Sequence, residues 1–169
     1  MARLGEAEAV LKEALVGTLG LVDADGKPYI VPLNFVYVPE AEYQERFALT
    51  AGDSDAIGRI VFHCALTGRK LDCLAHQPQV CFNAYTEVRM ALTGDKACDC
   101  SCRYASATCF GRARIVTDHA EKIALLTALS AHYMGYDPVP PGDERTRKTG
   151  VVEIAVTELS GKRNVDPGK

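Results

Sequence analysis

The stretch IVFHCALTGRK, residues 60–70, places an apolar run directly before a glycine turn and two adjacent cations. The apolar run predicts a strand over residues 59–65, and the residues after the turn predict a short helix. Backbone N–H groups at the start of a helix lack partners, and Arg69 and Lys70 add positive charge beside them. A solvated helix start that is basic by chance is the alternative, although cations near a helix N-terminus oppose the helix dipole. The turn at Gly68 therefore favours the binding of a phosphate.

Short strands dominate the rest of the chain. They are expected at residues 18–22, 29–38, 78–85, 104–116 and 151–159, with helices at residues 7–15, at residues 69–75 and after Asp118. Pro32 lies inside one of these strands and cannot donate to a ladder, so that strand is either an edge or broken there. Gly111 indicates a β-bulge in another strand. This order predicts a mainly β chain, a single domain over residues 1–169, built as a small antiparallel barrel with about three peripheral helices.

Three regions lie outside the expected strands, and only one of them has a clear secondary-structure signal. The helix after Asp118 can be capped by that residue, with Glu121 three positions later as in a capping box. Its apolar stripe is expected on Ile123, Leu126, Leu129 and Tyr133. The stretch 39–58 shows no clear pattern beyond a possible strand at residues 47–50. The stretch 135–150 is rich in proline, glycine and charge, and is expected to be a surface loop.

Composition and charge narrow the function classes. With 19 basic and 22 acidic residues the net charge is −3, so no overall field attracts nucleic acid or an anionic membrane surface. The first residues are amphipathic and acidic and do not resemble a signal peptide, and no apolar run is long enough to cross a bilayer. Seven cysteines without an export signal favour free thiols in a reducing compartment. We therefore expect a cytoplasmic protein that binds neither nucleic acid nor membranes.

Several motifs, taken in order, resemble a known family. They are GTLGLVDADGKPYIVPLNFVY at residues 17–37, IVFHCALTGRKLDCL at 60–74, PQVCF at 78–82, YASATCFGRARIV at 104–116, EKIALLTAL at 121–129 and VTELSGK at 156–162. Their order and spacing resemble the nitroimidazole-resistance branch of the FMN-binding split barrels, which are relatives of pyridoxamine phosphate oxidase. The resemblance covers most of the chain. It implies a split β-barrel homodimer that binds FMN at the subunit interface, with the flavin phosphate held by the turn that carries Arg69 and Lys70.

The resemblance also assigns residues to the rest of the flavin. It implies that the ring lies along the strand backbone of Pro32, Leu33 and Asn34, which would explain a proline in a strand. Asn34 would hydrogen-bond the edge of the ring. Tyr104 and Ser106 belong to the YASA segment, which stands where the family tends to have Tyr-x-Ser-Val. These two residues would approach the flavin from nearby or from the other subunit.

His63 lies at the end of the strand that precedes the basic turn. An imidazole there could bind phosphate, donate a proton to a reduced substrate or occupy an axial metal position. From the residues alone, a histidine satisfied by a backbone carbonyl is the simpler interpretation. The resemblance favours a place for His63 in the flavin site, and no residue is assigned as a catalytic acid or base.

The chain departs from the family pattern at two places. The stretch 39–58 is longer than the usual connection before the basic strand, and Ala107 replaces the commoner valine. Neither departure touches the phosphate turn. The longer stretch could, however, cover or reshape the substrate side of the site.

The segment CDCSC, residues 98–102, places three thiols at alternate positions, so an extended segment would turn all three to one side. Three thiolates can hold a soft metal if Cys109 or His63 completes the set. The spacing differs from the familiar C-x-x-C, and the fourth ligand would have to come from far away. We therefore expect free thiols in a structural loop and no metal site.

These observations favour an FMN-binding flavoprotein that acts as a reductase or oxidase on a small organic molecule. Nitroimidazole reduction is the activity implied by the branch that the chain resembles, and oxidase chemistry like that of pyridoxamine phosphate oxidase is the other. A non-catalytic flavin- or haem-binding module, with His63 or a cysteine on iron, is the alternative. A metal-sensing protein built on the CDCSC segment is a third hypothesis.

Overall fold

The computed structural model of the chain describes residues 4–47 and 55–164. Its centre is a seven-stranded sheet with the order β2-β1-β5-β6-β7-β4-β3, in which every neighbouring pair is antiparallel. The two edge strands, β2 (Pro28–Leu33) and β3 (Val36–Pro39), are separated in the chain by Asn34 and Phe35 alone. Because so short a connection joins the two edges, the sheet must curl until they meet. The sheet is therefore a barrel that is split between β2 and β3.

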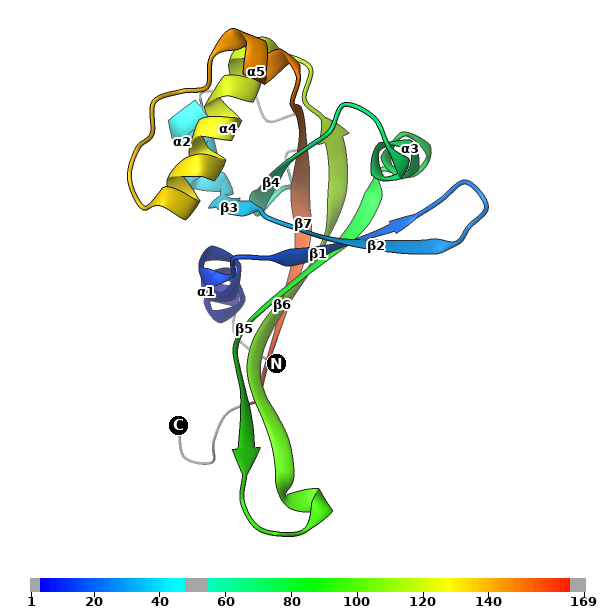
Figure 1. Cartoon of the computed structure of the whole chain (residues 1–169), viewed down its shortest axis with the longest axis vertical. Helices are drawn as coiled ribbons and strands as arrows, with labels where there is room; N and C mark the ends of the chain where they lie inside the picture. Colours follow the sequence, from blue (N-terminus) through cyan, green and yellow to red (C-terminus); the bar gives the residue numbers. More distant parts are fainter. Residues whose placement is uncertain (1–3, 48–54, 165–169) are drawn as a thin grey trace.

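The other strands differ greatly in length. They are β1 (Gly17–Val22), β4 (Gly58–Cys64), β5 (Gln79–Leu92), β6 (Cys100–Ile115) and β7 (Gly150–Asn164). The α-helices are α1 (Leu4–Glu13), α2 (Glu40–Phe47), α3 (Arg69–His76), α4 (His119–Met134) and α5 (Asp143–Arg147), and η1 (Ala97–Asp99) is a 3₁₀ turn. Helices α2, α4 and α5 gather at one end of the molecule, and the β5–β6 hairpin extends beyond the barrel at the other (Figure 1). No helix among the described residues is long and apolar enough to span a membrane.

Two clusters of buried side chains hold the barrel and its helices together. In the larger cluster Phe35, Phe62 and Phe82 are fully buried, and the rings of Phe35 and Phe82 meet edge to face with 4.8 Å between centroids. The smaller cluster packs α2 and α4 against β4 through residues such as Tyr43 and Leu125. Fully burying a large apolar side chain contributes about 1.5–3 kcal/mol. The burial of Phe35 therefore fixes the split of the barrel, directly after the exposed Asn34.

The predicted strands are present, with one break. The expected strand over residues 29–38 is divided into β2 and β3 at Asn34 and Phe35. Pro32 lies on β2, which is an edge of the sheet. Both interpretations of the proline therefore hold, because the strand is an edge and its backbone is interrupted two residues later.

Two local signals in the sequence are confirmed. The register between β6 and β7 shifts between Phe110 and Gly111, as a bulge at this position requires. A Cβ on Gly111 would lie 2.1 Å from the carbonyl oxygen of Ala155, so the close approach of the two strands there needs glycine. The side chain of Asp118 caps α4 by accepting a hydrogen bond of 2.8 Å from the backbone N–H of Glu121.

The structure adds two α-helices to the three expected. Helix α2 lies in the stretch 39–58, and α5 lies in the stretch 135–150, where a surface loop was expected. Of the possible strand at residues 47–50, Phe47 instead ends α2, and residues 48–50 lie outside the described part of the chain. Helix α2 forms although only Tyr43 is buried on it, because a tertiary network described below holds its polar residues.

The buried face of α4 is displaced from the expected stripe. Leu125, Ala128 and Leu129 are buried, whereas Ile123 and Leu126 are only partly buried. The helix is apolar over much of its circumference, so its sequence does not single out one face. The position of β3 and β4 beneath it decides which side becomes the core.

A buried ionic network, which we call the Glu153 network, joins α2, α4 and three strands. Its centre is the Glu153 carboxylate, which is 1% exposed. Arg59, 2% exposed, lies between two acids, with 3.2 Å from its Nη1 to Glu153 Oε1 and 2.7 Å from its Nε to Glu40 Oε2. The hydroxyl of Tyr43 donates to Glu153. This set of contacts attaches α2 to β4 and β7.

The second half of the Glu153 network reaches α4. Arg114 of β6 places its Nε 3.0 Å from Glu153 Oε1 and also pairs with Glu121 in the first turn of α4. The hydrogen bonds to Glu121 and Glu153 raise the pKa of the Arg114 guanidinium, although burial acts in the opposite direction. Because buried charges are stable only when they are paired, the network requires all of these partners together.

Candidate functional site

The basic turn lies between β4 and α3. Gly68 caps the helix with φ 131°, a backbone conformation that L side chains rarely adopt. Its carbonyl oxygen accepts the N–H of Leu71 at 2.8 Å and that of Asp72 at 3.2 Å. The N–H groups of Arg69 and Lys70 precede these bonds, in the first turn, where helical N–H groups have no intrahelical acceptor. The turn therefore presents two backbone donors beside two cationic side chains, as the sequence predicts.

Arg69 is oriented by the hairpin between β1 and β2. Its Nη2 lies 3.0 Å from Asp23 Oδ2, and its guanidinium lies 4.5 Å from the centroid of the Tyr29 ring. Asp23 also accepts the backbone N–H of Lys27 at 2.9 Å, and this bond, together with Arg69, holds the pKa of Asp23 below its ordinary value. The side chain is still 56% exposed. Arg69 is thus positioned by Asp23 while its remaining donors face solvent.

Lys70 leaves the same turn toward β4. Its Nζ lies 5.3 Å from the centroid of the Phe62 ring. Burial raises the pKa of the neighbouring Cys64 thiol, and the charge of Lys70 partly offsets this effect. Arg69 and Lys70 therefore lie on two sides of the first turn of α3, one toward the β1–β2 hairpin and one toward β4.

His63 precedes the turn but does not join the two cations. Side chains alternate along β4, so His63 faces away from the side on which the buried Phe62 lies, next to Lys70. His63 is exposed, and among the described residues its ring has no hydrogen-bonding or ionic partner. The simpler interpretation, an imidazole bonded to a backbone carbonyl, is therefore not what the described residues show.

Pro32, Leu33 and Asn34 lie at the end of the edge strand β2, beside the split of the barrel. Strand β2 pairs with β1 on one side only, so backbone groups on its other side are free for a ligand. Pro32 and Asn34 are exposed and Leu33 is partly buried. The side-chain amide of Asn34 donates to the carbonyl of Leu15 at 3.2 Å. This bond fixes the direction of Asn34 at the edge.

Tyr133, which the sequence places in the apolar stripe of α4, forms hydrogen bonds at this edge. The hydroxyl of Tyr133 accepts the backbone N–H of Phe35 at 2.9 Å and lies 2.6 Å from the carbonyl oxygen of Leu15, to which it donates. Leu15 is also the acceptor for Asn34. Tyr133 therefore holds the split of the barrel against α4. The only sequence signal was a hydroxyl-bearing ring at the end of a helix, which does not reveal such a role.

We expect Tyr133→Phe to lower the free energy of unfolding by about 1–3 kcal/mol, because the buried N–H of Phe35 loses its acceptor. Urea denaturation followed by circular dichroism measures this change. Tyr136→Phe is the matched control, since the Tyr136 side chain is 61% exposed. An equal and small effect for both substitutions would show that the Tyr133 hydroxyl does not hold the split.

Tyr104 and Ser106 lie on β6, which strands β1 and β5 separate from the edge strand β2. They pair with Asn164 and Lys162 of β7, and the hydroxyl of Ser106 donates to the Lys162 carbonyl at 3.3 Å. Arg69 contacts Asp23 and Tyr29 of the β1–β2 hairpin, whereas Tyr104 and Ser106 contact Lys162 of β7.

The cysteines do not gather into a cluster. Cys98 belongs to the η1 turn, whereas Cys100 and Cys102 lie on β6, so the structural loop expected over residues 98–102 is present only in its first part. Cys109 is buried in the core, and burial raises the pKa of its thiol to about 12. Within residues 4–47 and 55–164, no three His, Cys, Asp or Glu side chains come together in a way that could hold a metal ion.

The sequence and the fold of the chain are similar to those of several known proteins. A profile of the family described as Pyridoxamine 5′-phosphate oxidase matches residues 4–163. A solved structure of a candidate 5-nitroimidazole antibiotic resistance protein from Bacteroides thetaiotaomicron is 23% identical, with a TM-score of 0.72 over 95% of this chain and 84% of that one. No curated protein sequence matches the chain.

Two further solved structures are similar over nearly the whole chain. The flavocytochrome Anf3 from Azotobacter vinelandii is 20% identical with a TM-score of 0.71, and the match covers 99% of this chain and 70% of that one. An FAD and haem binding protein from Mycobacterium smegmatis is 19% identical with a TM-score of 0.74, and the match covers 98% and 73%. At these identities the likeness establishes the fold, which is the split barrel that the sequence analysis expected.

Proposed function

Because the chain belongs to the pyridoxamine 5′-phosphate oxidase family, we propose that it is a flavoprotein that binds FMN at the split of its barrel and transfers electrons to a small organic molecule. The observation that carries the proposal is the basic turn at the start of α3, where two cationic side chains flank the backbone N–H groups of the first helical turn, beside an open strand edge. A phosphate and a planar ring with polar edges are the chemistry that such a pair of surfaces suits.

The residues present fit the two ends of FMN. Arg69 and Lys70 would hold the phosphate, with Gly68 allowing the backbone to turn toward it. The free edge of β2 at Pro32 and Leu33 would face the ring, and Asn34 would hydrogen-bond a polar atom of the ring edge. The bound flavin would supply the electron chemistry, while the chain sets its orientation and its access to solvent.

A second copy of the chain completes this site in our proposal. Tyr104 and Ser106 contact β7 and not the basic turn of their own chain, so in our proposal they approach the flavin from a partner. The projecting β5–β6 hairpin exposes a row of large apolar side chains, namely Tyr85, Val88, Met90 and Leu92, each more than half exposed. Exposed apolar rows of this kind usually mark an interface. We therefore propose a homodimer whose interface buries on the order of 2,000 Å².

Titration calorimetry with FMN, FAD and haem tests the cofactor, and light scattering of the same sample tests the dimer. We expect FMN to bind and the loaded protein to have twice the mass of the chain. A monomer that retains flavin would contradict the dimer, because Tyr104 and Ser106 could then have no place in the site. Binding of haem in preference to every flavin would contradict the proposed cofactor.

Activity needs its own experiment. The flavin of the loaded protein is reduced under anaerobic conditions, and its reoxidation is followed with and without a nitroimidazole. We expect the nitroimidazole to accelerate reoxidation, as the resemblance to the nitroimidazole-resistance branch implies. Reoxidation at an unchanged rate with a nitroimidazole, with pyridoxamine phosphate and with other small acceptors would leave a flavin-binding module without this enzymatic function.

One observation favours the alternative of a haem-binding module. The exposed His63 has an imidazole with no partner among the described residues, and an unpaired imidazole is a common axial ligand of haem iron. One of the similar structures is named as an FAD and haem binding protein, and another as a flavocytochrome. A Soret band in the reconstituted protein that His63→Ala removes would support this function. If no Soret band forms after addition of haem, the haem-binding function is excluded.

A further inference from the structure

Lys122 of α4 is the one buried lysine in the part of the chain that the structure describes, with 8% of its surface exposed. The other buried polar or charged residues there have partners. Arg59, Glu121 and Glu153 are paired in the Glu153 network, and Thr146 donates to a backbone carbonyl at 3.1 Å. For the Lys122 ammonium, no acceptor is found among the described residues. A buried charge is unfavourable unless it is paired, so this lysine indicates an anionic ligand.

The Lys122 ammonium can be reached from solvent. The described side-chain polar atoms that are enclosed and have no partner are Thr86 Oγ1 and His132 Nε2. Lys122 Nζ is not one of them, so part of its surface is accessible. Because so little of the residue is exposed, water solvates this ammonium incompletely. An anion at the opening could therefore contact Nζ and pair with its charge.

Lys122 lies on the face of α4 that packs against the sheet. Leu125 and Leu129 share this face, one and two helical turns further along. Both are buried in the smaller core cluster, together with Val61 of β4 and Val151 of β7. Helical side chains tilt toward the N-terminus of their helix. Lys122 therefore extends from the packed face toward the start of α4, away from this apolar cluster.

The start of α4 lies beside the end of β4. The N–H of Val116, just before the helix, donates to the carbonyl of Val151 at 2.9 Å. The preceding residue of β7, Gly150, is paired with Cys64, which ends β4. In the view of Figure 1, α3 and α4 lie on the two sides of β4. Lys122 thus approaches from α4 the strand end after which the basic turn begins.

Lys70 approaches the same strand end from the other helix. It belongs to the first turn of α3, and its Nζ lies 5.3 Å from the centroid of the Phe62 ring on β4. Burial raises the pKa of the Cys64 thiol, and the charges of Lys70 and Lys122 offset part of this effect. The two cations therefore act on one place in the structure although they lie on different helices.

We propose that Lys122 binds an oxyanion at the end of β4 together with Lys70, and so adds a third cation to the basic turn. The assignment of this oxyanion to the phosphate of FMN rests on the proposed function. A phosphate there would pair the buried ammonium, which gives a reason for a lysine on the core-facing side of α4. Because Arg69 is shared with the carboxylate of Asp23, the third cation also compensates for the charge that this pair neutralises.

Thermal unfolding of the flavin-free protein with inorganic phosphate tests the oxyanion site. Phosphate should raise the melting temperature of the parent more than chloride does at equal ionic strength, because a ligand of the folded state stabilises it. Lys122→Met keeps an apolar stem and removes the ammonium. We expect this variant to melt at least as high as the parent in chloride, since an unpaired buried charge is lost, and to lose most of the phosphate effect. Lys122→Arg keeps the charge and should retain the effect.

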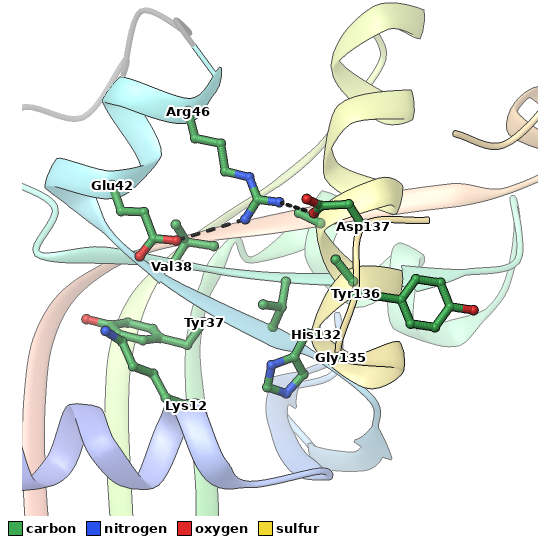
Figure 2. Close-up of a pocket in the computed structure, with 12 residues that line it drawn as sticks. Lys12, Tyr37, Val38, Glu42, Arg46, His132, Gly135, Tyr136 and Asp137 are labelled. Atoms are coloured by element: carbon green, nitrogen blue, oxygen red, sulfur yellow. Dashed lines mark ion pairs between the residues drawn. The ribbon is translucent and has the colours of Figure 1, made fainter. Parts of the chain in front are cut away.

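Titration calorimetry with FMN and riboflavin tests the source of the oxyanion. Lys122→Met should bind FMN about tenfold more weakly than the parent and riboflavin equally well, as expected for the loss of one charge-assisted hydrogen bond to the phosphate. Lys12→Met is the matched control. Lys12 is exposed on α1, where Figure 2 shows its amine beside the Tyr37 ring, and its removal should change neither measurement.

The two experiments separate this inference from the proposed function. The inference is wrong if phosphate stabilises the parent no more than chloride does, or if Lys122→Met melts below the parent in chloride. It is also wrong if Lys122→Met keeps both the phosphate effect and the FMN affinity, and in that case the proposed function stands. A phosphate effect that depends on Lys122 in a protein that binds no FMN would support the oxyanion site and contradict the proposed function.

Discussion

The double substitution Arg69→Ala and Lys70→Ala is expected to weaken FMN binding by at least about a hundredfold. Each cation would lose a charge-assisted hydrogen bond to the phosphate, worth roughly 1.5–3 kcal/mol. Two such losses correspond to a factor of about a hundred or more in the dissociation constant. The fold should survive, because Arg69 is 56% exposed and its ion pair with Asp23 lies at the surface.

Calorimetric titration of apoprotein with FMN measures this effect. Arg145→Ala in α5 with Lys148→Ala directly after that helix is the matched control, since it also removes two exposed cations but away from the basic turn. Riboflavin, which lacks the phosphate, provides a second comparison. The double variant and the parent should bind riboflavin alike. If both variants bind FMN as tightly as the parent, the phosphate does not lie at the basic turn.

Loss of the central carboxylate of the Glu153 network is expected to have the largest effect on stability. Glu153→Gln keeps the shape of the side chain but leaves the buried Arg59 with Glu40 as its only acidic partner in the network, while the half-exposed Arg114 keeps Glu121. Removing one partner of a buried ion pair typically costs about 3–5 kcal/mol, because the remaining charge is desolvated and unpaired. The hydroxyl of Tyr43 also loses a charged acceptor.

Urea denaturation of the variant and the parent measures this loss. Glu158→Gln on the same strand is the matched control, since Glu158 is exposed and should change the free energy of unfolding by less than about 0.5 kcal/mol. Helix α2 depends most directly on the network, so its far-UV signal should be lost first. Equal midpoints for Glu153→Gln and Glu158→Gln would mean that the network does not stabilise the fold.

Much of the barrel could be predicted because its signals are local. The apolar runs and the turn residues locate each strand within a few positions, and Gly111 and Asp118 mark a bulge and a helix cap through their own chemistry. The basic turn was predictable for the same reason, since Gly68, Arg69 and Lys70 are adjacent in the sequence and form one structural unit.

The features that sequence reasoning missed depend on contacts between distant residues. Helix α2 is polar and buries only Tyr43, whose acceptor Glu153 lies 110 positions away. Tyr133 bonds Phe35 across 98 positions. Lys122 is buried only because α4 packs against β3 and β4, which are distant from it in the sequence. No periodicity or motif in the sequence predicts contacts between residues so far apart, so these contacts are seen only in the folded structure.

Tyr104 and Ser106 show a different limit of prediction from the sequence. The resemblance implies that they approach the flavin from nearby or from the other subunit, and within one chain they pair with β7. We propose the second of these alternatives, in which a second chain supplies them. The homodimer and the site are therefore one hypothesis, and the exposed apolar row on the β5–β6 hairpin is the surface on which it depends.

The visible absorption spectrum of the purified protein, with the released chromophore identified by mass spectrometry, tests the central claim most directly. We predict a yellow protein with a flavin spectrum that releases FMN in stoichiometric amount, or an apoprotein that acquires this spectrum when FMN is added. A protein that shows only a Soret band, or that stays colourless and binds no flavin after addition of FMN, would contradict the claim.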